Sequence, residues 1–153
     1  MVSSVDDVAA YVINEFQSPI STMKLQKLCY MAQGWSLAIT DEALFNDDFE
    51  AWKNGPVNYR LFDQHRGQFL VDAWPSGDPQ TIAPIARAVL DGAIRNYGGL
   101  SGMQLGELTH QDETPWSRAR AKTKATNDGR SRMTIAREDI QSHFKKLLGL
   151  KAA

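Results

Sequence analysis

Apolar residues recur along the chain at spacings of three and four, and this pattern predicts a mainly helical fold. The first such stripe covers residues 5–16. Ser4 is placed to cap this helix with its hydroxyl, and the carboxylates of Asp6 and Asp7 favour the positive end of the helix dipole. We therefore predict that the chain begins with a helix that packs through one face.

The second stretch, residues 22–39, is apolar on almost every side. A helix that lacks a polar face is usually buried, so we expect the rest of the chain to pack around this one. The predicted fold class is thus mainly α, a compact multi-helix domain around a buried central helix. The apolar residues of the stretch are Met23, Leu25, Leu28, Cys29, Tyr30, Met31, Ala32, Trp35, Leu37 and Ile39.

The hydrophobic period changes after the central helix. The polar triplet at residues 46–48 favours a turn, and residues 49–52 alternate as a short strand does. We predict a small β-hairpin near residues 44–52. It is expected to end just beyond, because Gly55 permits a positive φ and Pro56 has no N–H for a sheet ladder.

Further helices are predicted downstream. A short one fits residues 57–65, and the clearest amphipathic stripe runs over residues 82–97 with Ile85 on its apolar side. Ser101 and Gln104 then have the spacing of a capping box, in which each side chain bonds to the backbone of the other residue.

The C-terminal part also carries helix signals. Thr114 followed by Pro115 is typical of an N-cap and first helical position, and residues 127–129, Asn-Asp-Gly, predict a loop. A last amphipathic helix is expected over residues 135–148. Its outer face is predicted to hold Arg137, Lys145 and Lys146.

The overall composition fits one globular domain over residues 1–153, with 42% hydrophobic residues. A net charge of −1 gives no general bias toward nucleic acid or acidic membranes. Residues 118–151, however, hold ten lysines and arginines against three acidic residues. We interpret this basic segment as a solvated helix face and loop, with nucleic-acid binding as the alternative.

The sequence points to the cytoplasm and to no membrane partner. Cys29 is the only cysteine, so an intramolecular disulfide is impossible and a reducing compartment fits. Residues 1–16 lack the basic region and continuous apolar core of a signal peptide. No run approaches the ~18 apolar residues that a membrane-spanning helix needs.

Candidate chemistry is sparse. His65, His110 and His143 lie far apart in sequence and show no metal-ligand spacing, so no metal site is predicted. Cys29 lies in the apolar central helix, where a cysteine is usually a small buried hydrophobe. The glycine-rich residues 98–102 follow a helix and lack the ending of a phosphate loop, which fits a helix C-cap. We predict no cofactor and no catalytic residue.

One polar cluster keeps an enzymatic alternative open. Just before Trp116 the chain holds a base, His110, and two carboxylates, Asp112 and Glu113, which a small hydrolase could use. A helix terminus in which Thr109 and His110 bond to the backbone needs the same residues, and we favour this interpretation. The tryptophans serve either as core residues or as interface anchors. They are Trp35, Trp52, Trp74 and Trp116.

Three motifs occur in order along the chain. Residues 24–35 read KLQKLCYMAQGW, residues 51–57 read AWKNGPV, and the sequence LTH at residues 108–110 is followed by PW at residues 115–116. Together they resemble the Panacea domain, the family of SocA-like and phage-associated GepA-like proteins, with Met31 where an aromatic residue is usual. The positions that match the helix motif are Lys24, Leu25, Gln26, Lys27, Leu28, Tyr30, Gln33 and Trp35.

The resemblance implies an antitoxin that binds an unrelated, cognate protein toxin directly and suppresses it without catalysis. The alternatives are an adaptor that delivers the toxin to a cellular protease, and an autoregulator that binds nucleic acid through the basic segment. We expect the second and third motif segments to lie close together, where they either form the partner surface or brace the core. The partner-binding residues predicted there are Trp52, Asn54, Gly55, Pro56, Val57, Tyr59, His110 and Trp116.

Overall fold

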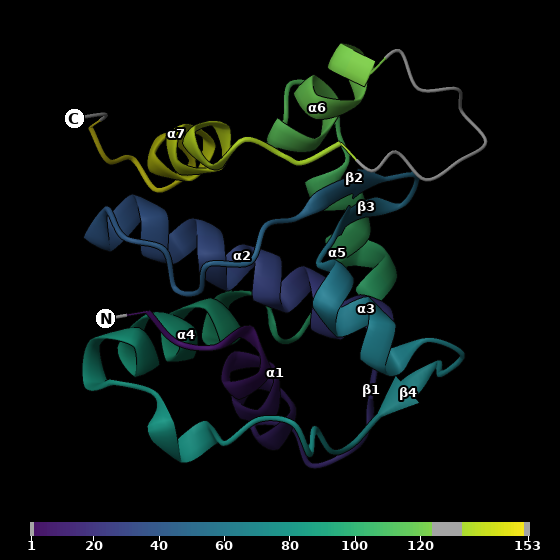
Figure 1. The fold of residues 1–153 in the computed structure, drawn as a ribbon. Coiled ribbons are helices and arrows are strands. Elements are labelled where there is room, and N and C mark those ends of the chain that lie inside the picture. Colours follow the sequence, from purple (N-terminus) through teal and green to yellow (C-terminus); the bar gives the residue numbers. More distant parts are fainter. Residues whose placement is uncertain (1, 124–132, 152–153) are drawn as a thin grey trace.

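The computed structural model describes residues 2–123 and 133–151, and it is mainly helical, as the sequence predicts (Figure 1). The loop predicted at residues 127–129 lies outside the described residues. The described elements are α1 (Val5–Asn14), β1 (Ile20–Ser21), α2 (Thr22–Thr40), β2 (Glu50–Trp52), β3 (Gly55–Val57), α3 (Tyr59–His65), β4 (Leu70–Val71), the 3-10 helix η1 (Pro79–Thr81), α4 (Pro84–Tyr97), α5 (Gly102–Thr109), α6 (Pro115–Thr123) and α7 (Arg137–Leu147).

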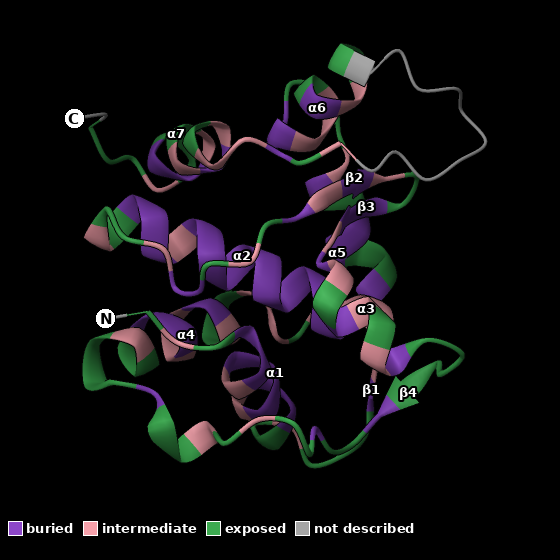
Figure 2. Cartoon of the chain, viewed as in Figure 1, coloured by how far each residue is buried: buried purple, intermediate pink, exposed green. Residues whose placement is uncertain are grey.

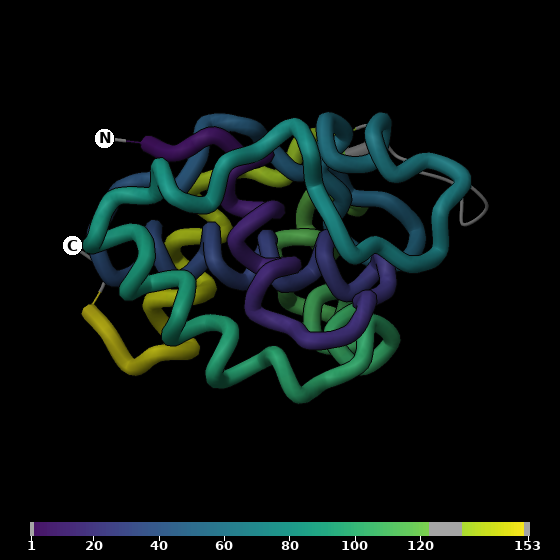
Figure 3. Tube along the Cα trace, turned by 90° about the horizontal axis from the view of Figure 1, so that it is seen from below, coloured from purple at the N-terminus to yellow at the C-terminus, as the bar shows by residue number. Residues whose placement is uncertain are grey.

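Helix α2 is the central element, and the other helices gather around it (Figure 1). α1, α4, α5 and α7 each pack against it, and α1 crosses it in the view from below (Figure 3). Thirteen of its nineteen residues are buried, so almost no side of the helix is left to water (Figure 2). The prediction of a buried central helix is confirmed.

Several helices begin where the local sequence signals place them. The Ser4 hydroxyl accepts a hydrogen bond from the Asp6 N–H at 3.1 Å, and Ser101 and Gln104 form both bonds of a capping box. Helix α4 differs from its prediction in one respect. Ile85 is 72% exposed, because the buried residues of that helix begin only at Val89.

The hairpin exists, but its second strand lies further along the chain than the sequence suggests. β2 pairs with β3. The segment just beyond residue 52, where the sequence predicts that the hairpin ends, therefore forms its turn and second strand. Pro56 is tolerated there because it faces Ala51, whose backbone bonds point elsewhere. The Ala51 N–H donates to the Met133 carbonyl at 3.0 Å, and its carbonyl accepts from Arg120 at 2.8 Å. No ladder bond is therefore required of the proline.

The C-terminal helix also departs from expectation at one residue. Lys145, predicted on the outer face of α7, is buried, and its Nζ lies 2.8 Å from a carboxylate oxygen of Asp41. The same ammonium donates to the Ala38 carbonyl at 3.1 Å. Lysine thus satisfies the C-terminal end of α2, where free carbonyls attract a cation.

A buried carboxylate fastens α1 to the segments that follow the hairpin. Asp6 accepts hydrogen bonds from the Trp74 indole at 3.0 Å, from the Gln64 amide at 2.7 Å and from Arg60 at 2.9 Å. Burial raises the pKa of Asp6, but these three donors outweigh it and hold the pKa below its ordinary value. Trp74 is accordingly a core residue and not an exposed anchor.

Gly34 gives a test of how tightly α7 packs on α2. A Cβ at this position would overlap the ring of Phe144, so we expect Gly34→Ala to lower the free energy of unfolding by about 1–3 kcal/mol despite the higher helix propensity of alanine. Urea unfolding measures the change. Gly99→Ala is the control, because nothing lies within 4 Å of a Cβ there, and it should be close to neutral. Equal stability of the two variants would contradict the packing described.

Candidate functional site

The second and third motif segments lie side by side. The indole N–H of Trp116, at the start of α6, donates to the carbonyl of Trp52 in β2. Arg120, one turn further along α6, lies with its guanidinium carbon 5.3 Å from the Trp116 ring centroid. The His110 ring also packs on the Trp116 ring, with the two ring centroids 5.5 Å apart. Residues more than sixty positions apart therefore share one surface.

The predicted partner-binding residues differ in exposure. Asn54, in the hairpin turn, is exposed, whereas Gly55 and Pro56 are buried as part of β3. A Cβ on Gly55 would lie 3.0 Å from both Lys27 Cε and Thr109 Oγ1, and the residue has a φ of 119°, so glycine is required there. The other five are half-buried, and with Asn54 they form what we call the hairpin surface: Trp52, Asn54, Val57, Tyr59, His110 and Trp116.

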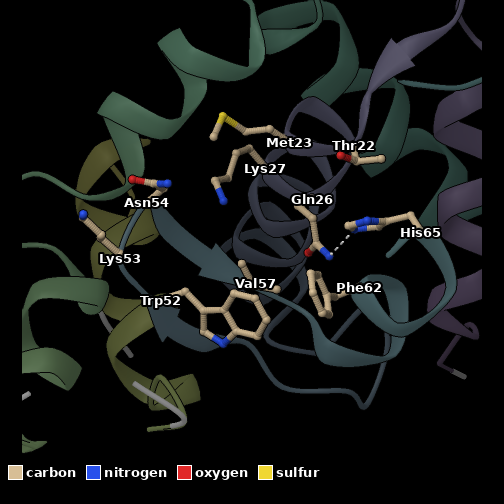
Figure 4. Close-up of a pocket in the computed structure, with 10 residues that line it drawn as sticks. All are labelled: Thr22, Met23, Gln26, Lys27, Trp52, Lys53, Asn54, Val57, Phe62 and His65. Carbon is tan, nitrogen blue, oxygen red and sulfur yellow. Dashed lines mark hydrogen bonds between the residues drawn. The ribbon is translucent and has the colours of Figure 1, made fainter. Parts of the chain in front are cut away.

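A cavity of about 320 Å³ lies beneath the hairpin, between α2 and α3 (Figure 4). One wall is aromatic, because the rings of Trp52 and Phe62 meet edge to face with centroids 4.7 Å apart. The volume is within the range of small-molecule and side-chain pockets. The lining residues are Thr22, Met23, Gln26, Lys27, Trp52, Lys53, Asn54, Val57, Phe62 and His65.

Lys27 is the buried charge of this cavity. Lys27 is 2% exposed, and its Nζ donates to the Pro56 carbonyl at 2.9 Å. Burial lowers the pKa of Lys27 to about 7, because the charged form loses its hydration. No carboxylate in the part of the chain that the structure describes lies within 4.0 Å of this amine.

Gln26 and His65 form a fixed polar pair at the floor of the cavity. The Asn58 N–H donates to Gln26 Oε1 at 2.8 Å, which sets the orientation of the amide. Gln26 Nε2 then donates to the Asn58 carbonyl and to His65 Nε2, both at 3.0 Å. The ring nitrogen must accept, so His65 is neutral with its proton on Nδ1. Burial, and then the charge of Lys27, lower the pKa of His65, which favours the same state.

The remaining residues of the helix motif serve the fold. Gln33 repeats the role of Gln26 two turns later, since its amide donates to the Phe45 carbonyl at 2.9 Å and accepts from the Leu44 N–H at 2.8 Å. Lys24 donates to the Gly98 carbonyl at 2.7 Å. Trp35 is half-buried, and its indole donates to the Tyr97 hydroxyl at 3.3 Å. The other motif residues, Leu25, Leu28 and Tyr30, are buried.

The polar cluster at residues 109–113 is built as a helix terminus. Thr109 donates its hydroxyl to the Gly106 carbonyl at 2.9 Å, and the His110 N–H donates to the same carbonyl at 3.1 Å. Asp112 and Glu113 are exposed and line a separate hollow bounded by α2, α4, α5, α6 and α7, while the His110 ring packs on Trp116. The base and the carboxylates thus belong to different environments, as expected of a cap and its following turn.

Cys29 is a free and buried cysteine of α2. Burial raises the pKa of the Cys29 thiol to about 12, which keeps it protonated. Among residues 2–123 and 133–151, no group of three or more histidines, cysteines or acidic residues is arranged to hold a metal ion. Within the same residues, no helix is long and apolar enough to cross a bilayer.

Sequence reasoning missed the cavity, although it singled out several of its residues for other reasons. Met23, Phe62 and His65 come from two helices whose packing is a tertiary property. A local signal did exist, since Gln26 and Lys27 are adjacent polar residues in the otherwise apolar run of residues 25–32. Polar side chains at buried positions need partners, and such positions often mark sites.

Comparison with known proteins identifies relatives of this chain. The family described as "Antitoxin SocA-like, Panacea domain" matches residues 25–117. Antitoxin SocA of Caulobacter vibrioides is 31% identical over 115 residues, which cover 64% of this chain and 58% of that relative. No solved structure matches the chain.

The buried amine predicts a specific pH dependence of stability. The pKa of the Lys27 amine is 10.5 in the unfolded chain and about 7 in the folded chain. Between these two pH values the unfolded state binds more protons than the folded state, so the free energy of unfolding of the wild type rises with pH. Relative to Lys27→Met, we expect the wild-type free energy of unfolding to rise by about 3 kcal/mol from about pH 7 to about pH 9.5.

Urea unfolding of both proteins at the two pH values measures this difference. Lys53→Met is the control, because it removes a lysine that is exposed on the hairpin turn. A parallel pH profile for wild type and Lys27→Met would show that the folded protein does not suppress the charge of this amine.

Proposed function

Because the chain belongs to the Panacea-domain family of SocA-like antitoxins, we propose that it is the antitoxin of a toxin–antitoxin pair and neutralises a cognate protein toxin by direct binding, without catalysis. The observation that carries this proposal is the joining of two family motifs at the hairpin surface by the bond from Trp116 to Trp52. The matched region, residues 25–117, contains both segments.

The chemistry of the hairpin surface suits a protein partner. Half-buried tryptophan, tyrosine and histidine rings present apolar area together with polar edges, which is typical of interface anchors. Several of these rings contact one another, since Trp52 lies against Tyr59 and Phe62. Such a surface is already ordered, so little conformational entropy is lost when a partner binds.

Three of the described cations of the basic segment bond within the fold, which favours a protein partner over nucleic acid. Arg137 lies 3.3 Å from the Asp48 carboxylate, and Lys145 pairs with Asp41. Arg120 donates to the Ala51 carbonyl. Phosphate binding would need free lysines and arginines along one face.

Co-expression tests the proposed function. We expect the gene beside this one on its native genome to encode a protein that arrests bacterial growth when expressed alone, and co-expression of this chain to restore growth. The two proteins should co-purify through size-exclusion chromatography as a complex. A neighbour whose toxicity persists during co-expression, or a rescue without any complex, would contradict neutralisation by binding.

A matched pair of substitutions tests the hairpin surface. Asn54→Trp places a bulky side chain on the exposed turn and should weaken toxin binding at least tenfold, or about 1.4 kcal/mol, in calorimetric titration. Asn96→Trp makes the same change on the exposed side of α4 and should leave the affinity unchanged. Equal affinities of the two variants would place the interface elsewhere on the molecule.

A further inference from the structure

We infer that the cavity beneath the hairpin binds an acidic side chain presented by the protein partner, whose carboxylate pairs with the Lys27 ammonium. This inference rests on the proposed function, because it names a group that the toxin contributes to the complex. It assigns the cavity a ligand class, an aspartate or glutamate side chain that enters past the hairpin turn.

Lys27 has an incomplete set of hydrogen-bond partners. An ammonium group has three N–H donors, and the structure gives this one a single acceptor, the Pro56 carbonyl at 2.9 Å. A buried cation is stable when it is paired with an anion and hydrogen-bonded. Among the described residues no carboxylate supplies that pair.

The polar side chains next to Lys27 form hydrogen bonds with other groups. Gln26 Oε1 accepts from the Asn58 N–H, and Gln26 Nε2 donates to the Asn58 carbonyl and to the His65 ring. The acceptor nitrogen of His65 is used in that contact. Neither side chain accepts a hydrogen bond from Lys27, whose ammonium bonds to the Pro56 carbonyl, so a group that enters the cavity would supply an added acceptor.

The charge and shape of the cavity also suit an anion. Lys27 extends from α2 into the region bounded by Met23, Asn54 and Val57 (Figure 4). No acidic residue lines the cavity, and its rim carries a second cation, Lys53, and the amide of Asn54, both exposed. The positive charge at the entrance thus attracts an anion, and the Lys27 ammonium lies at the base of the cavity.

The walls indicate which anion fits. Met23, Trp52, Val57 and Phe62 provide an apolar lining between rim and base. A carboxylate on a methylene stem matches this sequence of environments, because its stem contacts the apolar walls and its charge meets the ammonium. A phosphate group would bring a second negative charge to a base that holds one cation. The geometry therefore favours an acidic side chain.

Titration with blocked amino acids tests the inference on the full chain without the toxin. The probe is N-acetyl-glutamate methylamide, and its neutral match is N-acetyl-glutamine methylamide. At about pH 6.5, where most of the Lys27 amine is charged, we expect the glutamate probe to shift the NMR signals of the Gly55 amide and the Trp52 indole. It should bind at least tenfold more tightly than the glutamine probe.

Two further readouts separate ion pairing from general contact. The bound glutamate probe should raise the pKa of Lys27, measured through its Cε resonance, because a nearby anion favours the charged amine. Lys27→Met should bind both probes equally, whereas Lys24→Met, one turn earlier on the same helix, should behave as wild type. Equal binding of the two probes to the wild type, or no detectable shift, overturns the inference even if Lys27→Met fails to fold.

The source of the carboxylate is tested in the same way. Acetyl-trialanine with a free C-terminal carboxylate should bind more weakly than the glutamate probe, and tighter binding of this peptide would overturn the assignment to a side chain. In the complex, Lys27→Met should weaken toxin affinity at least tenfold and Lys24→Met should not. A toxin that binds wild type and Lys27→Met equally would refute the inference and leave the proposed function intact, whereas absence of any complex would refute the proposed function and, with it, the inference that rests on it.

Discussion

The rest of the structure depends on one constraint, which is that polar side chains in a buried helix must find partners. Helix α2 is enclosed by its neighbours, yet Gln26, Lys27 and Gln33 lie on it. Each one bonds to the backbone of a segment outside the helices, at Asn58, Pro56 and Phe45 respectively. These bonds satisfy polar side chains of the helix and backbone carbonyls of the other segments at the same time. The core helix therefore also determines where those segments run.

The helices could be predicted from sequence because their signals are local. Caps such as Ser4 and the Ser101 capping box act within four residues. The strand at Gly55–Val57 could not be predicted, because proline is tolerated there only through bonds that Ala51 makes to distant segments. The burial of Lys145 likewise depends on Asp41, which is about a hundred residues away in sequence.

The candidate site divides in the same way. The family motifs anticipated that the hairpin and the start of α6 would meet, and the contact from Trp116 to Trp52 confirms this. The cavity behind them was not anticipated, since α3 supplies Phe62 and His65 only after the chain has packed. Its polar floor is fixed before any partner arrives, because Gln26 and His65 hold one another in a single hydrogen-bonding arrangement.

Gly55 has a consequence for how this protein could diversify. Any side chain at that position would press on Lys27 and Thr109, whereas its two predecessors in the turn, Lys53 and Asn54, project into solvent. The hairpin therefore joins a position that requires glycine to an exposed tip that has room for other side chains. Substitutions at the tip would alter which partner is recognised without disturbing the framework beneath it, so one scaffold could acquire a new specificity through very few mutations.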